Sequence, residues 1–423
     1  MTQRVILRVR PPLLVSMAAL FINGVLYATW GVSIPVIRSK FTVSEAELSL
    51  ALAAVAMGGI VTMAGSSRII NRYGSRTSAM VSGVMMAFCA SGIMLIPQYA
   101  PLVLLLILFG IFTAANDIAL NTQVSALERH SGRSLIGMLH ASFSAGGLTG
   151  SLLSGTWTHT GLGAEASFLV PSAIGALVIL CTFRYMVPLS VEQSSENICD
   201  KMVASSNWSL KATRRRLKLF GLLAFSALVV EGAFYDWSAI YMREIVYAPA
   251  AWSGYGYASF SFGLIAGRFS GDWIRDRIAH QKVVGYGGAL SLAGLIAVLI
   301  NFSAPTVILG FLLTGMGISN IIPLLFSSSA KLAVNSGLSP SEGLAITTRF
   351  GYAGLLAGPL IVGPAAEAVG LRVALATLGV ALFLTCTGWL LLSARTSGMP
   401  WRLVSKKKDS NDIADLPAGY HNR

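Results

Sequence analysis

The chain has 423 residues, of which 54% are hydrophobic and only 12% are charged, and its formal net charge is +13. Because soluble proteins carry about 25% charged residues, this composition excludes a water-soluble globular protein of this size. The positive charge alone would suit a nucleic-acid-binding protein, but the distribution of the basic residues argues against that class.

Apolar runs of roughly 20 residues, the length that a helix needs to cross a bilayer, recur along the whole chain. They do not alternate between apolar and polar residues as the strands of a membrane barrel do. The sequence therefore predicts an all-α membrane protein with twelve transmembrane helices, near residues 12–36, 45–67, 77–97, 101–127, 135–159, 165–188, 217–243, 250–271, 282–302, 305–331, 341–364 and 370–394.

The basic residues gather on one side of the predicted membrane. With the N-terminus placed inside, the tails, the even-numbered loops and the central loop hold all but five of the 31 lysines and arginines. The exceptions are Arg38, Lys40, Arg243, Arg349 and Arg372. This positive-inside bias predicts a multi-pass protein of the bacterial inner membrane with both termini in the cytoplasm. No nucleic-acid partner is expected.

One long polar segment, residues 189–216, separates the predicted helices into two groups of six. We expect an N-terminal bundle over 1–188, a cytoplasmic linker over 189–216, a C-terminal bundle over 217–395 and a disordered cytoplasmic tail over 396–423. Similar stretches recur in the two halves, namely NGVLY at 23–27 with EGAFY at 231–235, and Phe143 and Gly147 with Phe350 and Gly354. Duplicated halves predict two pseudo-symmetric bundles with the substrate site between them, near the membrane midplane.

Two motifs at the ends of the second and eighth predicted helices carry a family resemblance. Residues 67–76, SRIINRYGSR, are similar to the G-x-x-x-D-R-x-G-R-R loop of the major facilitator superfamily, and residues 267–277, GRFSGDWIRDR, are a better copy. Ser67 and Asn71 depart from the motif, so the first copy lacks the acid that the family carries at the position of Asn71. The resemblance implies gating roles for Arg72, Arg76, Arg268, Asp272, Asp276 and Arg277, with plain positive-inside charge as the alternative.

Two further stretches narrow the resemblance. Residues 116–123, NDIALNTQ, and 140–147, HASFSAGG, resemble a bacterial subgroup of the superfamily that includes fucose-permease-like and rhizopine-transport-like proteins. This resemblance implies the major facilitator fold, a monomer, and a sugar, a polyol or a derivative of one as substrate.

Few ionisable residues lie within the predicted helices, and each is expensive in hydrocarbon unless it is paired or hydrated. Asp117, Glu231 and Arg349 are the candidates for proton coupling, with Arg349 holding the deprotonated carboxylate or binding the substrate. Two structural alternatives remain open. Glu231 and Arg349 could form a static ion pair within the second half, and Asp117 with Asn121 could join neighbouring helices by hydrogen bonds.

Polar and aromatic residues at helical spacing form stripes on three predicted helices. Amides, carboxylates and hydroxyls can bind the hydroxyls of a polyol, while an aromatic ring can pack on the apolar face of a sugar. Pro323 should loosen the tenth helix near this site. The predicted substrate-binding residues are Asn23, Tyr27, Trp30, Asn116, Asp117, Asn121, Glu231, Tyr235, Asn320 and Arg349.

No enzyme motif is present: there is no HExxH, no Walker loop, no G-x-S-x-G and no zinc-spaced set of cysteine and histidine. We therefore expect no enzymatic activity, no cofactor and no metal, and an ion gradient as the energy source. The prediction is a proton-coupled secondary-active transporter of a small polar solute that works by alternating access. The alternatives are a drug or metabolite efflux antiporter of the same fold and a non-transporting membrane receptor or scaffold.

Overall fold

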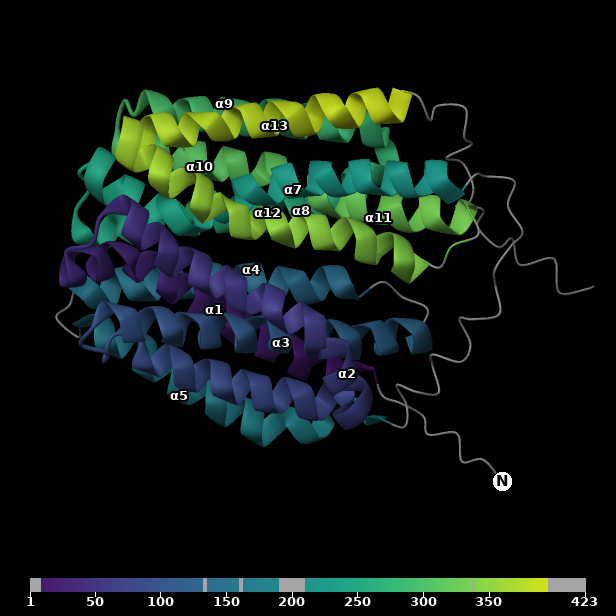
Figure 1. Ribbon diagram of the computed structural model, residues 1–423, viewed down its shortest axis with the longest axis horizontal. Helices are drawn as coiled ribbons and strands as arrows, with labels where there is room; N and C mark the ends of the chain where they lie inside the picture. Colours follow the sequence, from purple (N-terminus) through teal and green to yellow (C-terminus); the bar gives the residue numbers. More distant parts are fainter. Residues whose placement is uncertain are drawn as a thin grey trace, which may run out of the picture.

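The structure is a computed structural model, and it describes residues 9–131, 135–159, 163–189, 210–336, 338 and 340–394. Within these ranges every regular element is helical. The helices run side by side along one direction, as Figure 1 shows. The predicted tail over 396–423 and residues 190–209 of the predicted linker lie outside the described residues.

The first bundle contains α1 (Arg10–Phe41), α2 (Glu45–Gly92), α3 (Tyr99–Ser131), α4 (Ile136–His159), α5 (Gly163–Thr182) and a short 3-10 turn (Phe183–Tyr185). The long helix α2 covers the second and third predicted spans and breaks at Gly74, whose φ of 81° lies in the left-handed region that glycine adopts most readily. The sequence predicted a loop at residues 67–76, and that prediction is wrong. These residues are helical on either side of a single break at Gly74.

The second bundle contains α7 (Leu210–Ile240), a π-helical turn (Tyr241–Ile245), a 3-10 turn (Ala250–Trp252), α8 (Ser253–Arg277), α9 (His280–Ile300), α10 (Ala304–Ile318), α11 (Ile321–Asn335), α12 (Pro340–Val369) and α13 (Leu371–Ala394). Helix α7 begins within the range predicted as the linker. The break between α10 and α11 falls at Ser319 and Asn320. Its cause is Pro323, which has no N–H and whose ring clashes with the carbonyl four residues earlier.

Nine helical stretches of the described chain are long and apolar enough to cross a membrane. The second part of α2, α4 and α8 complete the twelve predicted spans, with α10 and α11 together forming one. Helices α4 and α8 pack against each other between the two bundles. A helix that meets protein on its polar face needs less hydrophobic surface than one surrounded by lipid. The twelve-helix fold in two six-helix bundles is confirmed.

Glycines bring the central helices of each bundle into close contact. A Cβ atom on Gly146 of α4 would collide with the backbone oxygen of Phe21 on α1, and a Cβ on Gly354 of α12 would collide in the same way with that of Phe225 on α7. Small residues permit this close approach in membranes, where packing rather than hydrophobicity joins helices. A glycine therefore contacts the backbone of the neighbouring helix both between α1 and α4 and between α7 and α12.

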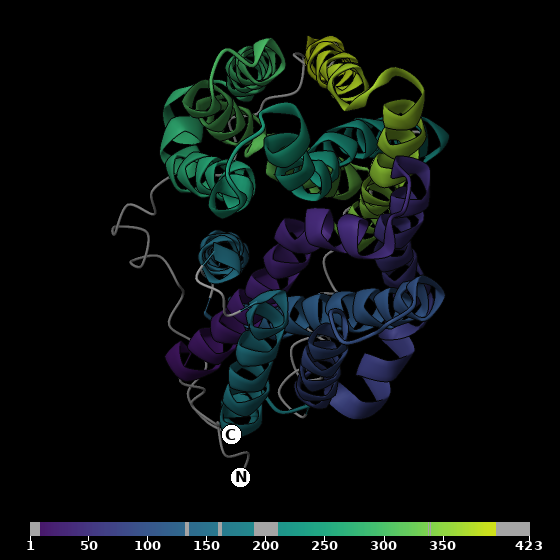
Figure 2. The same cartoon turned by 90° about the vertical axis from the view of Figure 1, so that its left-hand side faces the viewer.

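The bundles meet closely at the end that carries the α1–α2 and α12–α13 connections, called here the loop end, which faces the viewer in Figure 2. There α1 contacts α7, α2 contacts α12, and α4 contacts α8. Arg38 forms an ion pair with Glu244 of the other bundle and lies 3.6 Å from Glu45 of its own. The backbone N–H of Ala46 donates a hydrogen bond of 2.9 Å to the Glu367 carboxylate across the interface. The opposite end, where α1 and α7 begin, is called the terminal end.

Candidate functional site

A buried ion pair lies near the middle of the interface between the bundles. Glu231 on α7 accepts a hydrogen bond of 3.2 Å from Arg268 Nη2 on α8, and their side chains are only 11% and 21% exposed. The other guanidinium nitrogen, Nη1, donates to Ser144 Oγ on α4 of the first bundle at 2.9 Å. Arg268 therefore joins a carboxylate of its own bundle to a hydroxyl of the other.

A second polar group lies on the first-bundle side of the same interface. Asn121 donates to Asp117 Oδ1 at 3.1 Å, one turn away on α3, and its Oδ1 lies 3.1 Å from His140 Nε2 on α4. From the second bundle, the Tyr352 hydroxyl on α12 donates to Asp117 Oδ2 at 3.5 Å. Asp117 is thus a second point where the two bundles are joined through a carboxylate.

The two groups are neighbours, because Ser144 Oγ also donates to the backbone oxygen of His140 at 3.4 Å. Together they form one polar cluster, defined as Asp117, Asn121, His140, Ser144, Glu231, Arg268 and Tyr352. It crosses the interface twice and contains both carboxylates that the sequence selected for proton coupling. Buried charge of this kind within a membrane marks a functional site by default.

Aromatic rings line the interface beside the polar cluster. Tyr27 of α1 and Tyr235 of α7 approach edge to face, with ring centroids 6.5 Å apart, and Tyr235 also lies 4.9 Å from the ring of Tyr257 on α8. The buried Tyr257 hydroxyl has no hydrogen-bond partner within the described protein, and Ser261 Oγ lies within reach of the Tyr235 hydroxyl. Tyr257 and Ser261 both face the small Gly147 of α4. Unpartnered buried hydroxyls beside rings are groups that a bound solute or water can satisfy.

Several predicted substrate-binding residues have structural contacts instead. Asn116 donates to the Ala79 backbone oxygen at 2.8 Å and so faces α2 of its own bundle. Asn320 donates to the Gly267 backbone oxygen at 2.8 Å and joins α8 to the α10–α11 break. Asn23 donates to the Thr113 backbone oxygen at 3.4 Å, while its Oδ1 is buried without a partner. Trp30 is fully buried in the core.

The arginine partner of Glu231 differs from the one that the sequence suggested. Arg349 is exposed on α12, and it is Arg268 that forms the ion pair with Glu231. Arg268 was grouped with the gating motif because it follows Gly267, although the predicted span 250–271 already included it. A lone arginine inside a predicted span marks Arg268 as a candidate, but it marks Arg349 in the same way.

The remaining gating candidates are only partly described. Arg72 stacks over the ring of Tyr73 and Arg76 over the ring of Phe183, at 5.4 and 5.2 Å, near the break in α2. Arg277 is exposed at the end of α8. The side chains of Asp272 and Asp276 lie outside the described residues.

Comparison with known proteins shows that the chain is similar to membrane transporters. Residues 16–337 match the family model described as Major Facilitator Superfamily. The chain is 29% identical over 383 residues to the membrane protein MosC of Rhizobium meliloti, covering 90% of both chains.

Two solved structures share the fold at low sequence identity. One is a point mutant of the nucleoside transporter NupG, with a TM-score of 0.67, 10% identity, and 90% of this chain and 99% of that one covered. The other is the xylose transporter XylE from E. coli in a partially occluded inward-open conformation, with a TM-score of 0.66, 12% identity, and coverage of 90% and 97%.

Proposed function

The chain belongs to the Major Facilitator Superfamily, and from this premise we propose that it carries a small polyhydroxylated solute, such as a sugar, a polyol or a derivative, across the inner membrane with the energy of a proton gradient. The observation that carries the proposal is the polar cluster, in which Asp117 contacts Tyr352 of the opposite bundle and Glu231 is linked to the opposite bundle through Arg268 and Ser144. Membership of this family establishes that the chain is a membrane transporter and not an enzyme.

The substrate class follows from the chemistry beside the cluster. Tyr27, Tyr235 and Tyr257 offer flat apolar surfaces edged with hydroxyls, and the Tyr257 hydroxyl is buried without a partner. Rings that pack on C–H faces and polar atoms that bond hydroxyls together suit a polyhydroxylated molecule. An apolar drug would leave these hydroxyls and the charges of the cluster without partners, which disfavours an apolar drug as the substrate.

Proton coupling follows from what holds the bundles together in this conformation. Protonation of Glu231 removes its charge, so Arg268 loses its ion partner and its fixed position against Ser144. Asp117, protonated, likewise loses the charge that Tyr352 now faces. We assign to Arg268 the role of counter-ion that the sequence suggested for Arg349. Protonation would then free the bundles to rock about the site.

Replacing each carboxylate by its amide tests this mechanism. In Glu231→Gln and Asp117→Asn, solute uptake driven by a pH gradient into proteoliposomes is expected to fall at least 100-fold. Exchange of solute at equal pH on both sides is expected to persist in at least one variant, because that reaction needs no net proton movement.

Glu165→Gln is the matched control, since Glu165 is an exposed carboxylate in the first turn of α5. It is expected to transport like the wild type. Unchanged gradient-driven uptake in both site variants would exclude the coupling mechanism. A solute that moves only from the lumen outward would instead favour the exporter.

The loop end supplies a second test of alternating access. The positive-inside bias puts the terminal end in the cytoplasm, so the tight contacts at the loop end correspond to a conformation closed to the outside. Arg38 lies at this closure, where it pairs with Glu244 across the interface. Arg38→Gln is expected to favour opening about fivefold, the ratio that corresponds to roughly 1 kcal/mol for a partly exposed ion pair.

Opening can be measured by the reactivity of a cysteine at Ser49, whose side chain packs against Gly363 of α12 at the loop end. The four native cysteines are first replaced by alanine, and a membrane-impermeant thiol reagent is added from outside. Lys40→Gln is the control, because Lys40 donates its hydrogen bonds to Met94 and Ile96 of its own bundle. Equal labelling rates in the Arg38 and Lys40 variants would contradict a latch at Arg38.

A further inference from the structure

An apolar groove lies on the outer surface of the second bundle, between α7 and α13. Leu219, Leu222 and Leu223 of α7 form one wall, and Gly388, Leu391 and Leu392 of α13 form the other, around a volume of about 300 Å³. Leu222 and Leu391 are 55% and 66% exposed. The rings of Phe220 and Trp389, with centroids 5.9 Å apart, join the two helices beside it. The groove is separate from the polar cluster, which faces the other bundle.

Cations follow the same face of α7 toward its start. Lys211, Arg215 and Leu219 succeed one another at intervals of four, and Lys218 precedes Leu222 by four, so these side chains share one stripe of the helix. Lys211, Arg215 and Lys218 are all exposed. The stripe thus changes from basic to apolar within about two turns, where it enters the groove.

The length of α7 places this change at the membrane surface. Its 31 residues span about 46 Å, whereas the hydrocarbon core is about 30 Å thick. About ten residues therefore extend beyond the hydrocarbon. The first two turns are basic, so they lie at the level of the lipid head groups. The leucines that follow lie at the level of the acyl chains.

From this arrangement we infer that the α7–α13 groove binds an anionic glycerophospholipid of the surrounding bilayer. Its phosphate contacts Arg215 and Lys218, and one acyl chain lies between Leu222 and Leu391. Clusters of basic residues beside grooves between transmembrane helices suit anionic head groups. The leucines of the groove favour a lipid with acyl chains over a free anion, because a free anion would leave them without a partner.

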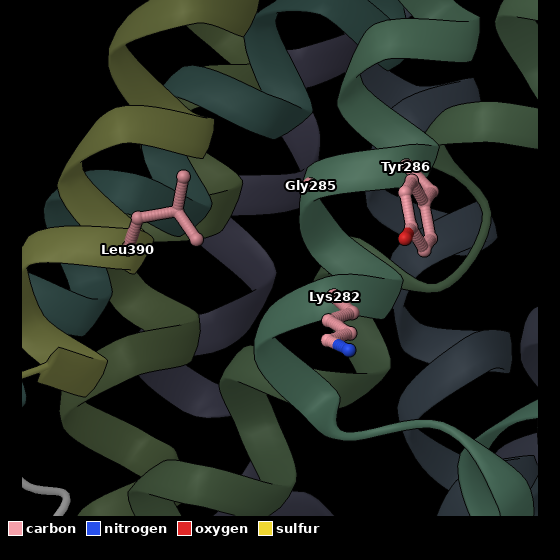
Figure 3. Close-up of a pocket in the computed structure, with 4 residues that line it drawn as sticks. All are labelled: Lys282, Gly285, Tyr286 and Leu390. Atoms are coloured by element: carbon pink, nitrogen blue, oxygen red, sulfur yellow. The ribbon is translucent and has the colours of Figure 1, made fainter.

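A second groove on the other side of α13 gives an internal comparison. Lys282, Gly285 and Tyr286 of α9 and Leu390 of α13 line a groove of about 330 Å³. Figure 3 shows where these four residues lie on the two helices. Lys282 is the one cation among these lining residues. The two grooves are alike in size. Arg215 and Lys218 precede the first groove on α7, whereas Lys282 lines the second, so the Lys282 variant reports whether the second groove competes for the same lipid.

The test uses the full-length protein in neutral detergent, with bound lipid counted by native mass spectrometry. Dioleoylphosphatidylglycerol is expected to bind wild type more tightly than dioleoylphosphatidylcholine. Each Lys or Arg near an anionic head group contributes roughly fivefold in affinity. The double variant Arg215→Gln/Lys218→Gln should therefore bind phosphatidylglycerol about 25-fold more weakly and phosphatidylcholine as before. Lys282→Gln is the control, and its effect on the tightest-bound phosphatidylglycerol should be less than twofold.

A second measurement locates the acyl chain without relying on the double variant. Phosphatidylglycerol with brominated chains should quench tryptophan fluorescence in wild type, and Trp389→Phe should remove part of that quenching. Inorganic phosphate at equal concentration should not displace the lipid. Any of four results would overturn the assignment. Wild type and the double variant could bind phosphatidylglycerol equally well, or Lys282→Gln could lose as much affinity as the double variant. Quenching could be unchanged by Trp389→Phe, or inorganic phosphate could displace the lipid.

Discussion

Arg268→Gln is expected to abolish solute transport and to lower the free energy of unfolding by about 3 to 5 kcal/mol. The reason is Glu231, whose side chain is 11% exposed and which has Arg268 as its ion partner. Removal of one member of a buried ion pair leaves an uncompensated charge, and that cost exceeds what the pair itself contributes. For a chain of this length the loss corresponds to a fall of about 3 to 6 °C in the thermal unfolding midpoint in detergent.

Two companion variants separate stability from function. The double variant Arg268→Gln/Glu231→Gln removes both charges and is expected to recover most of the unfolding midpoint without recovering transport. Arg268→Lys keeps the charge but lacks the planar fork that reaches Glu231 and Ser144 together, so partial stability and weak transport are expected. Lys331→Gln, which changes an exposed cation on α11, is the control. Wild-type transport in Arg268→Gln would refute a role for this arginine in the cycle.

Adding a single methyl group at Gly146 is expected to be among the most damaging small changes in the chain. A Cβ atom there would overlap the backbone oxygen of Phe21, which cannot rotate aside as a side chain can. Separating α1 from α4 to make room costs about 1 to 3 kcal/mol or more, since overpacked interiors relax only in part. Gly354→Ala should behave alike, because its Cβ would meet the Phe225 oxygen. The yield of monodisperse protein by size-exclusion chromatography and the unfolding midpoint measure the effect.

Gly137→Ala is the matched control on the same helix as Gly146. An added Cβ at this position meets no atom within 4 Å, so the substitution carries no steric cost. Gly137 is the second residue of α4, where alanine is favoured by less than the roughly 0.5 to 1 kcal/mol of a helix interior, so a stability equal to or slightly above that of wild type is expected. If Gly146→Ala and Gly137→Ala had the same unfolding midpoint, close backbone packing would not be what holds α1 to α4.

The site could be predicted in part. Asp117, Asn121, Tyr27, Glu231 and Tyr235 were selected from helical spacing and from the cost of charge in hydrocarbon, and all lie in or beside the polar cluster. Spacing gives the residues that share a face, but it does not say which neighbour that face meets. Asn116 precedes Asp117 directly, yet the rotation of α3 turns it toward α2.

The spacing of residues along one helix cannot predict hydrogen-bond or ion-pair partners that lie far away in the sequence. Arg268 lies 37 residues from Glu231 and 124 from Ser144, and Tyr352 lies 235 from Asp117. Nothing local in the sequence distinguishes Arg268 from Arg349 as the partner of Glu231. The choice depends on how α8 packs between α7 and α4. The sequence likewise placed Arg38 only as a charge in an outer loop. Its ion-pair partner, Glu244, comes from the other bundle and could not be predicted.

By itself the sequence determined the all-helical membrane fold, the twelve spans and their division into two halves, because the bilayer imposes a fixed length and an apolar composition on every helix that crosses it. Only the tertiary structure decided which polar residues meet at the interface, where α2 and the α10–α11 span break, and which arginine neutralises Glu231. Those outcomes depend on the rotation and separation of packed helices, which glycine contacts such as Gly146 with Phe21 set to within the size of one methyl group.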